Sequence, residues 1–216
     1  MIKHFILASI LWCTSWNELN AQTSIYEVFD NTTPITFLGI DFTNTRYIGR
    51  TGTVDTLEMI GLLNEMNDYI FAIRKDYNVA DALKKDSVVY DYDLVRNLNK
   101  NINPYNLISN NTDLINRLNK DSISNIIKNY PINENAAGIG MIYIVDNFFK
   151  RSEEVTVWLA FFDMQTKKVL LTERMIGIAE GFSFKLHWSK PFYLYLSDLK
   201  YGQFKSWKKK YLPKKK

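Results

Sequence analysis

The chain has 216 residues and a net charge of +4; 46% of its residues are hydrophobic and 23% are charged. These proportions are typical of one folded domain, or of two small ones, and exclude an intrinsically disordered chain. The positive charge is concentrated in residues 205–216, which include seven lysines. Without this segment and residues 1–21, acidic side chains outnumber basic ones. Nucleic-acid-binding proteins carry basic residues on a folded face or a base-reading arm, so we expect no nucleic-acid partner.

The N-terminus has the order of a secretory signal peptide. Lys3 and His4 form a basic start, residues 5–12 (FILASILW) form a compact apolar run, and a polar stretch leads to the small residue Ala21. The apolar run is too short to span a bilayer. We therefore predict a signal peptide over residues 1–21, cleaved after Ala21, and export from a bacterial cytoplasm to the periplasm or cell surface.

Cys13 is the only cysteine of the chain, and it lies inside the predicted signal peptide. A bacterial lipoprotein signal also ends in cysteine, but the tryptophan before Cys13 does not match its small-residue pattern, and lipidation stays open. Cleavage after Ala21 leaves no cysteine for a disulfide, a thiol nucleophile or a thiolate metal site. No later segment has about 18 uninterrupted apolar residues, so we predict no transmembrane helix.

The chain then alternates predicted strands and helices. Residues 22–33 are mostly polar and indicate an exposed lead-in. Residues 35–42 (ITFLGIDF) are apolar and β-branched, which is typical of a strand, and residues 44–53 contain two glycines and indicate a loop. Apolar residues at helical spacing predict an amphipathic helix over residues 55–75.

Four shorter elements follow this helix. Residues 79–84 predict a helical turn, and residues 87–90 (SVVY) a short strand. A helix is predicted over residues 93–102, with Asp93 as its cap and a proline after its end. Another helix is predicted over residues 112–129, where six leucines and isoleucines share one face.

The C-terminal half predicts three consecutive strands. They cover residues 138–145, 154–162 and 168–176, and residues 163–167 (DMQTK) form the turn between the last two. Their short spacing indicates an antiparallel meander. A helix over residues 189–200 is expected to close over it.

This order predicts an α/β (α+β) fold. We expect a mixed sheet with a C-terminal antiparallel meander and helices packed on it in two or three layers. One domain spans residues 22–200, and residues 201–216 form a basic C-terminal tail.

Two residues at the end of the first strand are candidates for ligand binding. Asp41 ends the strand, and Arg46 follows in the loop. If the neighbouring strands run parallel, this edge is where an open α/β sheet holds a ligand. The alternative is a hydrogen-bonded network that only stabilises the start of the loop.

His187 is the third candidate ligand-binding residue, as a general base or a lone metal ligand. The alternative is a histidine that packs beside Trp188. Asp91 and Asp93 are a carboxylate pair, for which turn and cap roles are the alternative to acid–base chemistry. Phosphate loops, nucleophile elbows, zinc motifs and calcium loops are absent from the sequence. We therefore assign no catalytic residue, metal site or cofactor, and favour a protein that is not an enzyme.

The basic tail mixes aromatic residues with lysines. One interpretation is a peripheral contact with anionic lipid or an envelope polymer. The alternative is a loose, solubilising end. The lysines that would tether the chain are Lys208, Lys209, Lys210, Lys214, Lys215 and Lys216.

Two stretches carry a resemblance. Residues 35–42 and the meander over residues 138–177 resemble uncharacterised small secreted bacterial proteins, a family with no assigned activity. More distantly, the meander resembles the periplasmic α/β modules of lipoprotein activators of penicillin-binding proteins and of curli-secretion proteins. Those strands end in an Asp-x-x-Thr-type turn, as residues 163–166 do here.

These observations favour an exported, non-catalytic binding or adaptor module of the bacterial cell envelope, whose partner is an envelope protein. The alternative is a small-ligand or glycan-binding protein with weak hydrolase chemistry, which would use Asp41, Arg46 or His187. A concave site that joins two of these residues would favour the alternative, and an exposed apolar patch would favour the adaptor.

Overall fold

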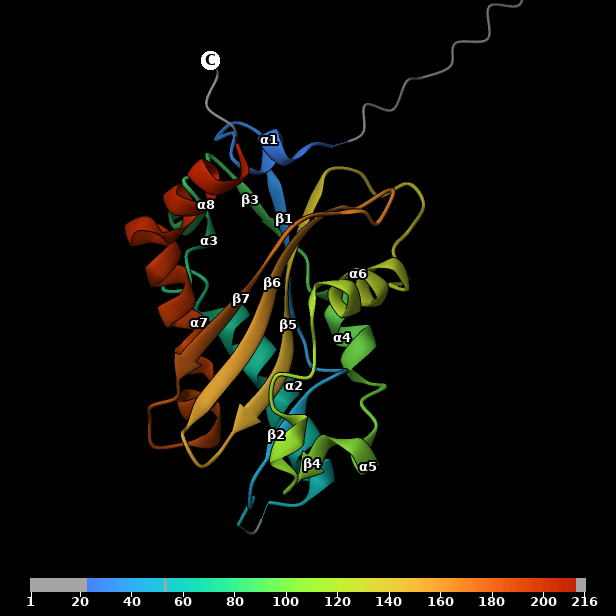
Figure 1. The fold of residues 1–216 in the computed structure, drawn as a ribbon, viewed down its shortest axis with the longest axis vertical. Helices are drawn as coiled ribbons and strands as arrows, with labels where there is room; N and C mark the ends of the chain where they lie inside the picture. The colour runs from blue at the N-terminus through green and yellow to red at the C-terminus, as the bar shows by residue number, and fades with distance from the viewer. Residues whose placement is uncertain (1–22, 53, 213–216) are drawn as a thin grey trace, which may run out of the picture.

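The computed structural model describes residues 23–52 and 54–212 and has a mixed α/β fold (Figure 1). One seven-stranded sheet runs through the molecule, which confirms the predicted fold class. The predicted signal peptide lies outside the described residues. The strands are β1 (Ile35–Asp41), β2 (Arg46–Ile48), β3 (Val88–Tyr90), β4 (Ile108–Ser109), β5 (Ile139–Phe149), β6 (Glu154–Asp163) and β7 (Val169–Ile178).

Strand β5 is the centre of the sheet. On one side, β1 runs parallel to its first half, with Ile35 opposite Ile139, and β2 runs parallel to its second half, with Arg46 opposite Asn147. Strand β3 lies parallel outside β1, and β4 lies parallel outside β2. Two short strands joined by a turn therefore take the place of one long strand beside the 11-residue β5.

The other side of β5 carries the antiparallel meander that the sequence predicts. Strand β6 pairs antiparallel with β5, and β7 pairs antiparallel with β6. The β6–β7 turn is held by Asp163, whose Oδ1 accepts a hydrogen bond from the Thr166 amide at 2.7 Å. Among the described strands β7 pairs with β6 alone, so it forms an edge of the sheet.

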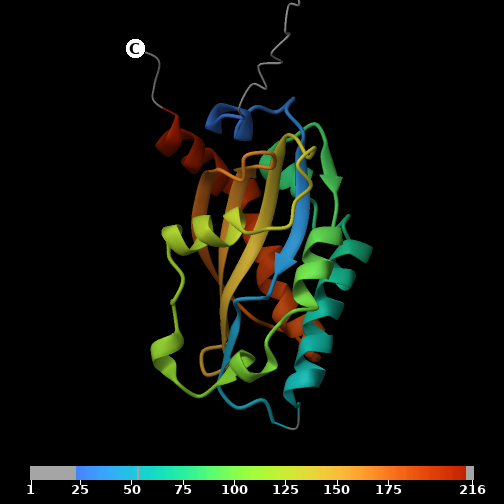
Figure 2. The same cartoon turned by 90° about the vertical axis from the view of Figure 1, so that its right-hand side faces the viewer.

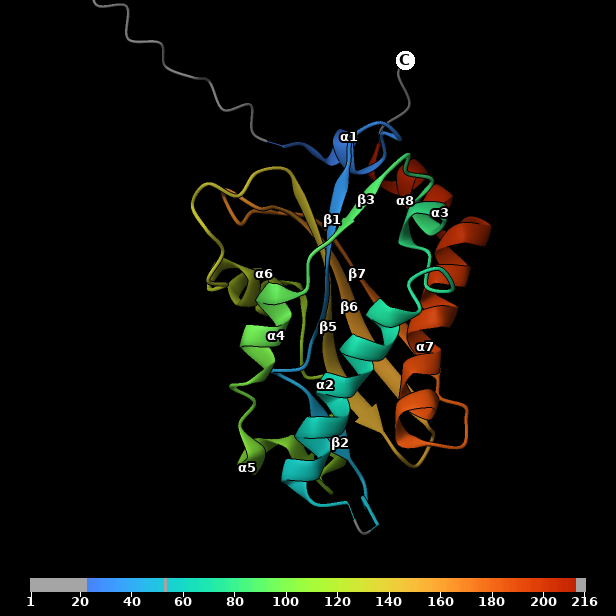
Figure 3. The ribbon, with the colours of Figure 1, turned by 180° about the vertical axis from the view of Figure 1, so that it is seen from behind.

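Helices cover both faces of the sheet. Helices α2 and α7 pack together on one face (Figure 3), and α6 lies on the opposite face (Figure 2). None of the helices in the described ranges is long and apolar enough to cross a membrane. The helices are α1 (Ile25–Val28), α2 (Thr56–Ala72), α3 (Val79–Leu83), α4 (Asp93–Asn99), α5 (Pro104–Leu107), η1 (Thr112–Leu114), α6 (Lys120–Lys128), α7 (Phe184–Asp198), the π-helical η2 (Leu199–Gln203) and α8 (Phe204–Tyr211).

Two buried asparagines complete the outer edge of β1. Strand β3 covers only the first three residues of β1, so the polar groups of Ile40 and Phe42 need other partners. Asn67 on α2 accepts from the Ile40 amide at 2.9 Å and donates to the Ile40 carbonyl at 2.8 Å. Asn99 on α4 accepts from the Phe42 amide at 2.9 Å and donates to the Ile40 carbonyl at 3.0 Å. Two helices are thereby fixed to the strand that ends at Asp41.

A glycine lets α4 approach β1 closely. Gly39 has φ of 91°, in the region that favours glycine, and the register of β1 against β5 shifts between Phe37 and Ile40. A Cβ at Gly39 would lie 2.3 Å from the ring of Tyr92, the residue before α4.

The prediction of one helix over residues 112–129 is wrong for the first half of that segment. Only a short 3-10 turn, η1, and then α6 form there. Asn116 has φ of 59°, which interrupts a right-handed helix. Asn119 caps α6 by accepting from the Ser122 amide at 2.9 Å. The segment between the two elements is bound to the sheet instead, because the Asn116 amide donates to Asn147 of β5 at 3.2 Å.

The N-terminal part is more ordered than predicted. Residues 22–33 include α1, and Val28 and Phe29 are buried. Residues 44–53 are not only a loop, because they contain β2. The helix predicted to end at residue 102 ends at Asn99.

Asp93 is not the cap of α4. It is the first helical residue, and Tyr92 occupies the cap position. The Asp91 carboxylate accepts from the Asp93 amide at 3.0 Å, so this pair takes the turn role. Similarly, the closing helix α7 begins before the predicted residue 189, because Ser183 accepts from the Leu186 amide at 3.3 Å and caps it.

The C-terminal segment differs from the predicted tail. Helix α7 continues through η2, where Gly202 has φ of 155°, into α8. Phe204 and Trp207 of α8 are buried, and the Phe204 ring lies 5.0 Å from that of Phe29. The predicted boundary at residue 201 therefore falls inside a packed helical segment, because these two aromatic side chains join the core.

Candidate functional site

Asp41 lies inside the protein, at the end of β1. Its side chain is fully buried. Its carboxylate accepts from the Thr43 amide at 2.8 Å, from the Thr43 hydroxyl at 2.6 Å and from the Tyr130 hydroxyl at 2.7 Å. Burial raises the pKa of Asp41, and the hydrogen bonds from Thr43 and Tyr130 oppose that rise. Through these three hydrogen bonds the Asp41 carboxylate connects β1 to the segment after α6. Its oxygens are therefore occupied within the protein and not open to a ligand.

Arg46 lies near a second buried carboxylate. Asp146 of β5 accepts from the Leu118 amide at 3.1 Å, and its Oδ1 has no partner among the described residues. Burial raises the pKa of Asp146, while Arg117 and Arg174 lower it. Burial, followed by the charge of Arg117, lowers the pKa of Arg46. Asp41 and Arg46 thus lie at either end of the same short turn, within a structural polar cluster.

His187 lies on the opposite face of the sheet. Arg46 adjoins residues of the segment before α6, whereas the next side chain, Tyr47, packs 5.7 Å from the Trp188 ring on α7. Successive residues of a strand point to opposite faces. The sheet therefore separates His187 from Arg46, and no single concave site joins His187 to the other two candidates.

His187 borders a hollow of its own. Its Nε2 lies 3.9 Å from Glu153 Oε1, and its ring is 4.7 Å from that of Trp188. Lys150 pairs with the same glutamate at 3.0 Å. Phe182 and Phe184 also line the hollow. A single imidazole beside an ion pair does not supply a set of metal ligands.

The predicted tether lysines have different surroundings. Lys208 donates to the Phe29 carbonyl at 3.2 Å, and Lys210 pairs with Glu173 of β7. Lys209 lies exposed on α8. Lys214, Lys215 and Lys216 lie outside the described residues.

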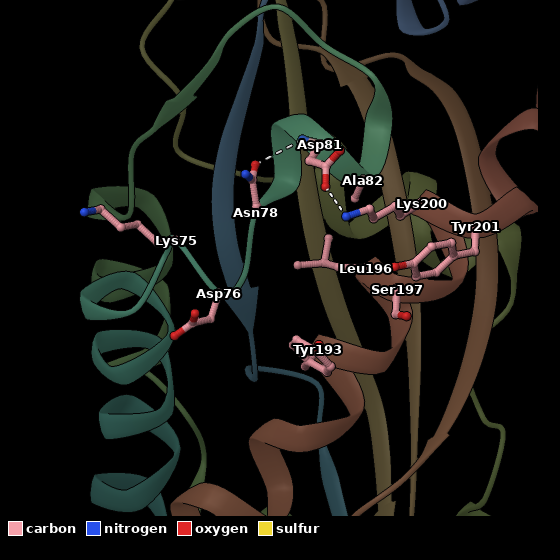
Figure 4. Close-up of a pocket in the computed structure, with 10 residues that line it drawn as sticks. All are labelled: Lys75, Asp76, Asn78, Asp81, Ala82, Tyr193, Leu196, Ser197, Lys200 and Tyr201. Atoms are coloured by element: carbon pink, nitrogen blue, oxygen red, sulfur yellow. Dashed lines mark hydrogen bonds and ion pairs between the residues drawn. The ribbon is translucent and has the colours of Figure 1, made fainter.

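A small hollow lies between α3, α7 and η2 (Figure 4). Asp81 reaches across it to the ammonium group of Lys200, while Asn78 accepts from the Asp81 amide at 3.0 Å (Figure 4). Lys84 also pairs with Asp81, at 3.4 Å. Lys84 and Lys200 therefore share one carboxylate.

Two exposed apolar side chains lie at the end of β7. Ile176 is 50% exposed and Ile178 is 52% exposed, and both lie on one face of the strand because they are two residues apart. Phe182, in the loop that follows, is fully exposed and borders the hollow beside His187. We call Ile176 and Ile178 the β7 patch.

No protein-family model matches the chain, and no curated protein or solved structure is significantly similar to it. The class of protein therefore rests on the fold and on the surfaces described above.

Sequence reasoning missed the residues that contact one another only in the fold. Asp146 and Arg117 lie far from Asp41 in sequence and carry no motif. The β7 patch had a signal, because Ile176 and Ile178 alternate with other residues at the end of a predicted strand. Which face they occupy depends on the packing of α6 and α7.

Proposed function

We propose that the chain is an exported, non-catalytic binding module of the bacterial cell envelope. Its partner is an envelope protein that adds an extended apolar segment to the free edge of β7. The observation that carries this proposal is the β7 patch, two exposed apolar residues on one face of an edge strand.

An edge strand offers unpaired amide and carbonyl groups to another chain. Strand β7 has ten residues and contains no proline, and its two charged residues, Glu173 and Arg174, precede the segment from Met175 to Ile178. Its ladder with β6 is regular from Leu171 to Ile178. An added strand would pair with this backbone and set alternate apolar side chains beside Ile176 and Ile178.

The envelope location rests on the N-terminal sequence and on the resemblance of the meander to periplasmic modules. The alternative, a small-ligand or glycan-binding protein, has less support. Asp41 is closed by three hydrogen bonds, and the sheet lies between Arg46 and His187.

The test places a photo-crosslinking amino acid at Ile178 in living cells. Val89 is the matched control site, because it is 55% exposed on the opposite edge strand β3. We expect one discrete envelope protein to crosslink at position 178 and not at position 89. A synthetic peptide of the crosslinked segment should then protect the backbone amides of β7 from hydrogen exchange.

The variant Ile176→Lys should abolish the crosslink from position 178, and the paired variant Ile176→Lys with Ile178→Lys should abolish the protection, because the lysines place charges on the docking face. Equal crosslinking at positions 178 and 89, or a peptide that protects no β7 amide, would refute the proposal. N-terminal sequencing of the same purified protein should give Gln22 as the first residue; a chain that begins at Met1 would refute export by cleavage.

A further inference from the structure

A groove runs along the C-terminal helices, away from the β7 patch. It consists of two adjoining hollows of about 340 and 500 Å³, which share Lys205 and Lys208. Sites of roughly 300–1,000 Å³ accommodate small ligands. We call it the lysine groove, and its lining residues are Phe29, Asn31, Lys84, Lys200, Tyr201, Gly202, Phe204, Lys205, Lys208, Lys209 and Leu212.

The groove carries uncompensated positive charge. Five lysines line it, and no carboxylate is among the described residues that do so. Asp81, beside the groove, pairs with Lys84 and Lys200. Lys208 bonds only to the neutral Phe29 carbonyl, so its charge is not cancelled.

A buried lysine, Lys85, lies next to the groove. Its ammonium group is held by the backbone carbonyls of Glu27 and Asp30. Burial lowers its pKa to about 8, and the carboxylates of Asp30 and Glu27 oppose that shift more strongly than the charge of Lys208 adds to it. The positive charge of the groove therefore rests on the lysines that line it. Because Lys84 and Lys200 pair with Asp81, Lys205, Lys208 and Lys209 are the ones that favour an anion between them.

Apart from Asn31, the rest of the lining is mostly apolar. Phe29, Phe204 and Leu212 lie beside the lysines, and Tyr201 is 79% exposed at the rim. Double-stranded nucleic acid would use the charges but not this surface, because its bases stack on one another inside the duplex. An anionic amphiphile uses both, since aromatic and lysine side chains together are typical of membrane–water interfaces. We propose that the lysine groove binds an acidic phospholipid at a membrane surface, with the phosphate between the three lysines and the glycerol and upper acyl chain against Leu212.

The experiment measures binding of the chain from Gln22 to Lys216 to vesicles. Vesicles of phosphatidylcholine with phosphatidylglycerol are compared with phosphatidylcholine alone. The variant Lys205→Gln, Lys208→Gln, Lys209→Gln should bind the acidic vesicles on the order of 100-fold more weakly. The triple variant Lys120→Gln, Lys128→Gln, Lys168→Gln removes three exposed lysines elsewhere and should bind within about twofold of the parent chain.

A further variant separates the groove from simple charge attraction. Leu212→Asn keeps every lysine and should still weaken binding several-fold, because it removes the apolar contact. Equal losses in the two triple variants, unchanged binding of Leu212→Asn, or equal binding to both vesicle types would overturn the proposal. So would displacement from vesicles by millimolar glycerol phosphate alone, which would indicate a site for a free phosphate ester.

The result of the vesicle-binding experiment does not depend on the partner proposed for β7. The variant Ile176→Lys with Ile178→Lys should retain binding to acidic vesicles, because its substitutions lie outside the groove. Tighter binding of the chain to single-stranded DNA than to acidic vesicles would assign the groove to a polyanion and contradict the lipid.

Discussion

At the scale of single residues, the buried carboxylates define the chemistry of the interior. Asp41 and Asp146 both have pKa values raised by burial. A group whose pKa is raised on folding binds more protons in the folded state than in the unfolded state. Between the ordinary pKa of aspartate and the raised value, the free energy of unfolding must therefore fall as the pH rises.

The Asp41→Asn variant tests this linkage. Asparagine can accept from Thr43 and donate to the Tyr130 oxygen, so the network keeps its shape without a charge. We expect a smaller loss of stability with rising pH, because the contribution of Asp41 is removed while that of Asp146 remains. Urea unfolding at several pH values between 4 and 8 measures the slopes. The exposed control Glu134→Gln should keep the parent slope, and an Asp41→Asn slope as steep as the parent's would contradict the prediction.

At the scale of elements, side-chain amides replace a missing strand beside β1. Asn67 satisfies both backbone groups of Ile40, which no strand pairs on that side. The contact explains why α2 carries a buried asparagine on its apolar face. It also fixes the end of β1, and thereby the position of Asp41.

Replacing Asn67 with alanine should lower the free energy of unfolding by about 2–3 kcal/mol, because the buried Ile40 amide then has no acceptor. The matched control is Asn64→Ala on the same helix, where the side chain donates only to the Ile60 carbonyl of α2. Chemical denaturation should give a change within about 0.5 kcal/mol for this control. Similar losses in both variants would show that the bonds to β1 contribute little.

At the scale of the whole molecule, the two ends of the described chain pack together. Phe29 follows α1, and Phe204 of α8 contacts it. The groove proposed for lipid lies at this junction, whereas the β7 patch lies beyond the other end of α7. One compact body thus presents two separate surfaces.

A pair of shortened chains tests the role of α8. The chain that ends at Gln203 loses the buried Phe204 and Trp207, and it should be less stable by several kcal/mol, since a buried Phe or Trp contributes about 3–5 kcal/mol. The chain that ends at Leu212 keeps α8 and should stay within about 0.5 kcal/mol of the full chain. Urea midpoints compare the three proteins. Equal midpoints for the two shortened chains would mean that α8 is not part of the stable core.

The elements that can be predicted from the sequence are those whose hydrophobic pattern is strong and local. The meander, β1 and the long helix α2 follow from runs and periodicities that neighbouring residues carry. The pattern failed at residues 112–129, because the left-handed Asn116 and the bonds to Asn147 override helical spacing.

Which polar and apolar residues share a surface depends on contacts between distant parts of the chain. Asp41 is closed by Tyr130, 89 residues away, and the β1–β2 turn and α7 place Arg46 and His187 on opposite faces of the sheet. The C-terminal lysines become one wall of a groove because Phe204 and Trp207 hold α8 against the body. These contacts join segments distant in the chain, and local propensity contains no information on them.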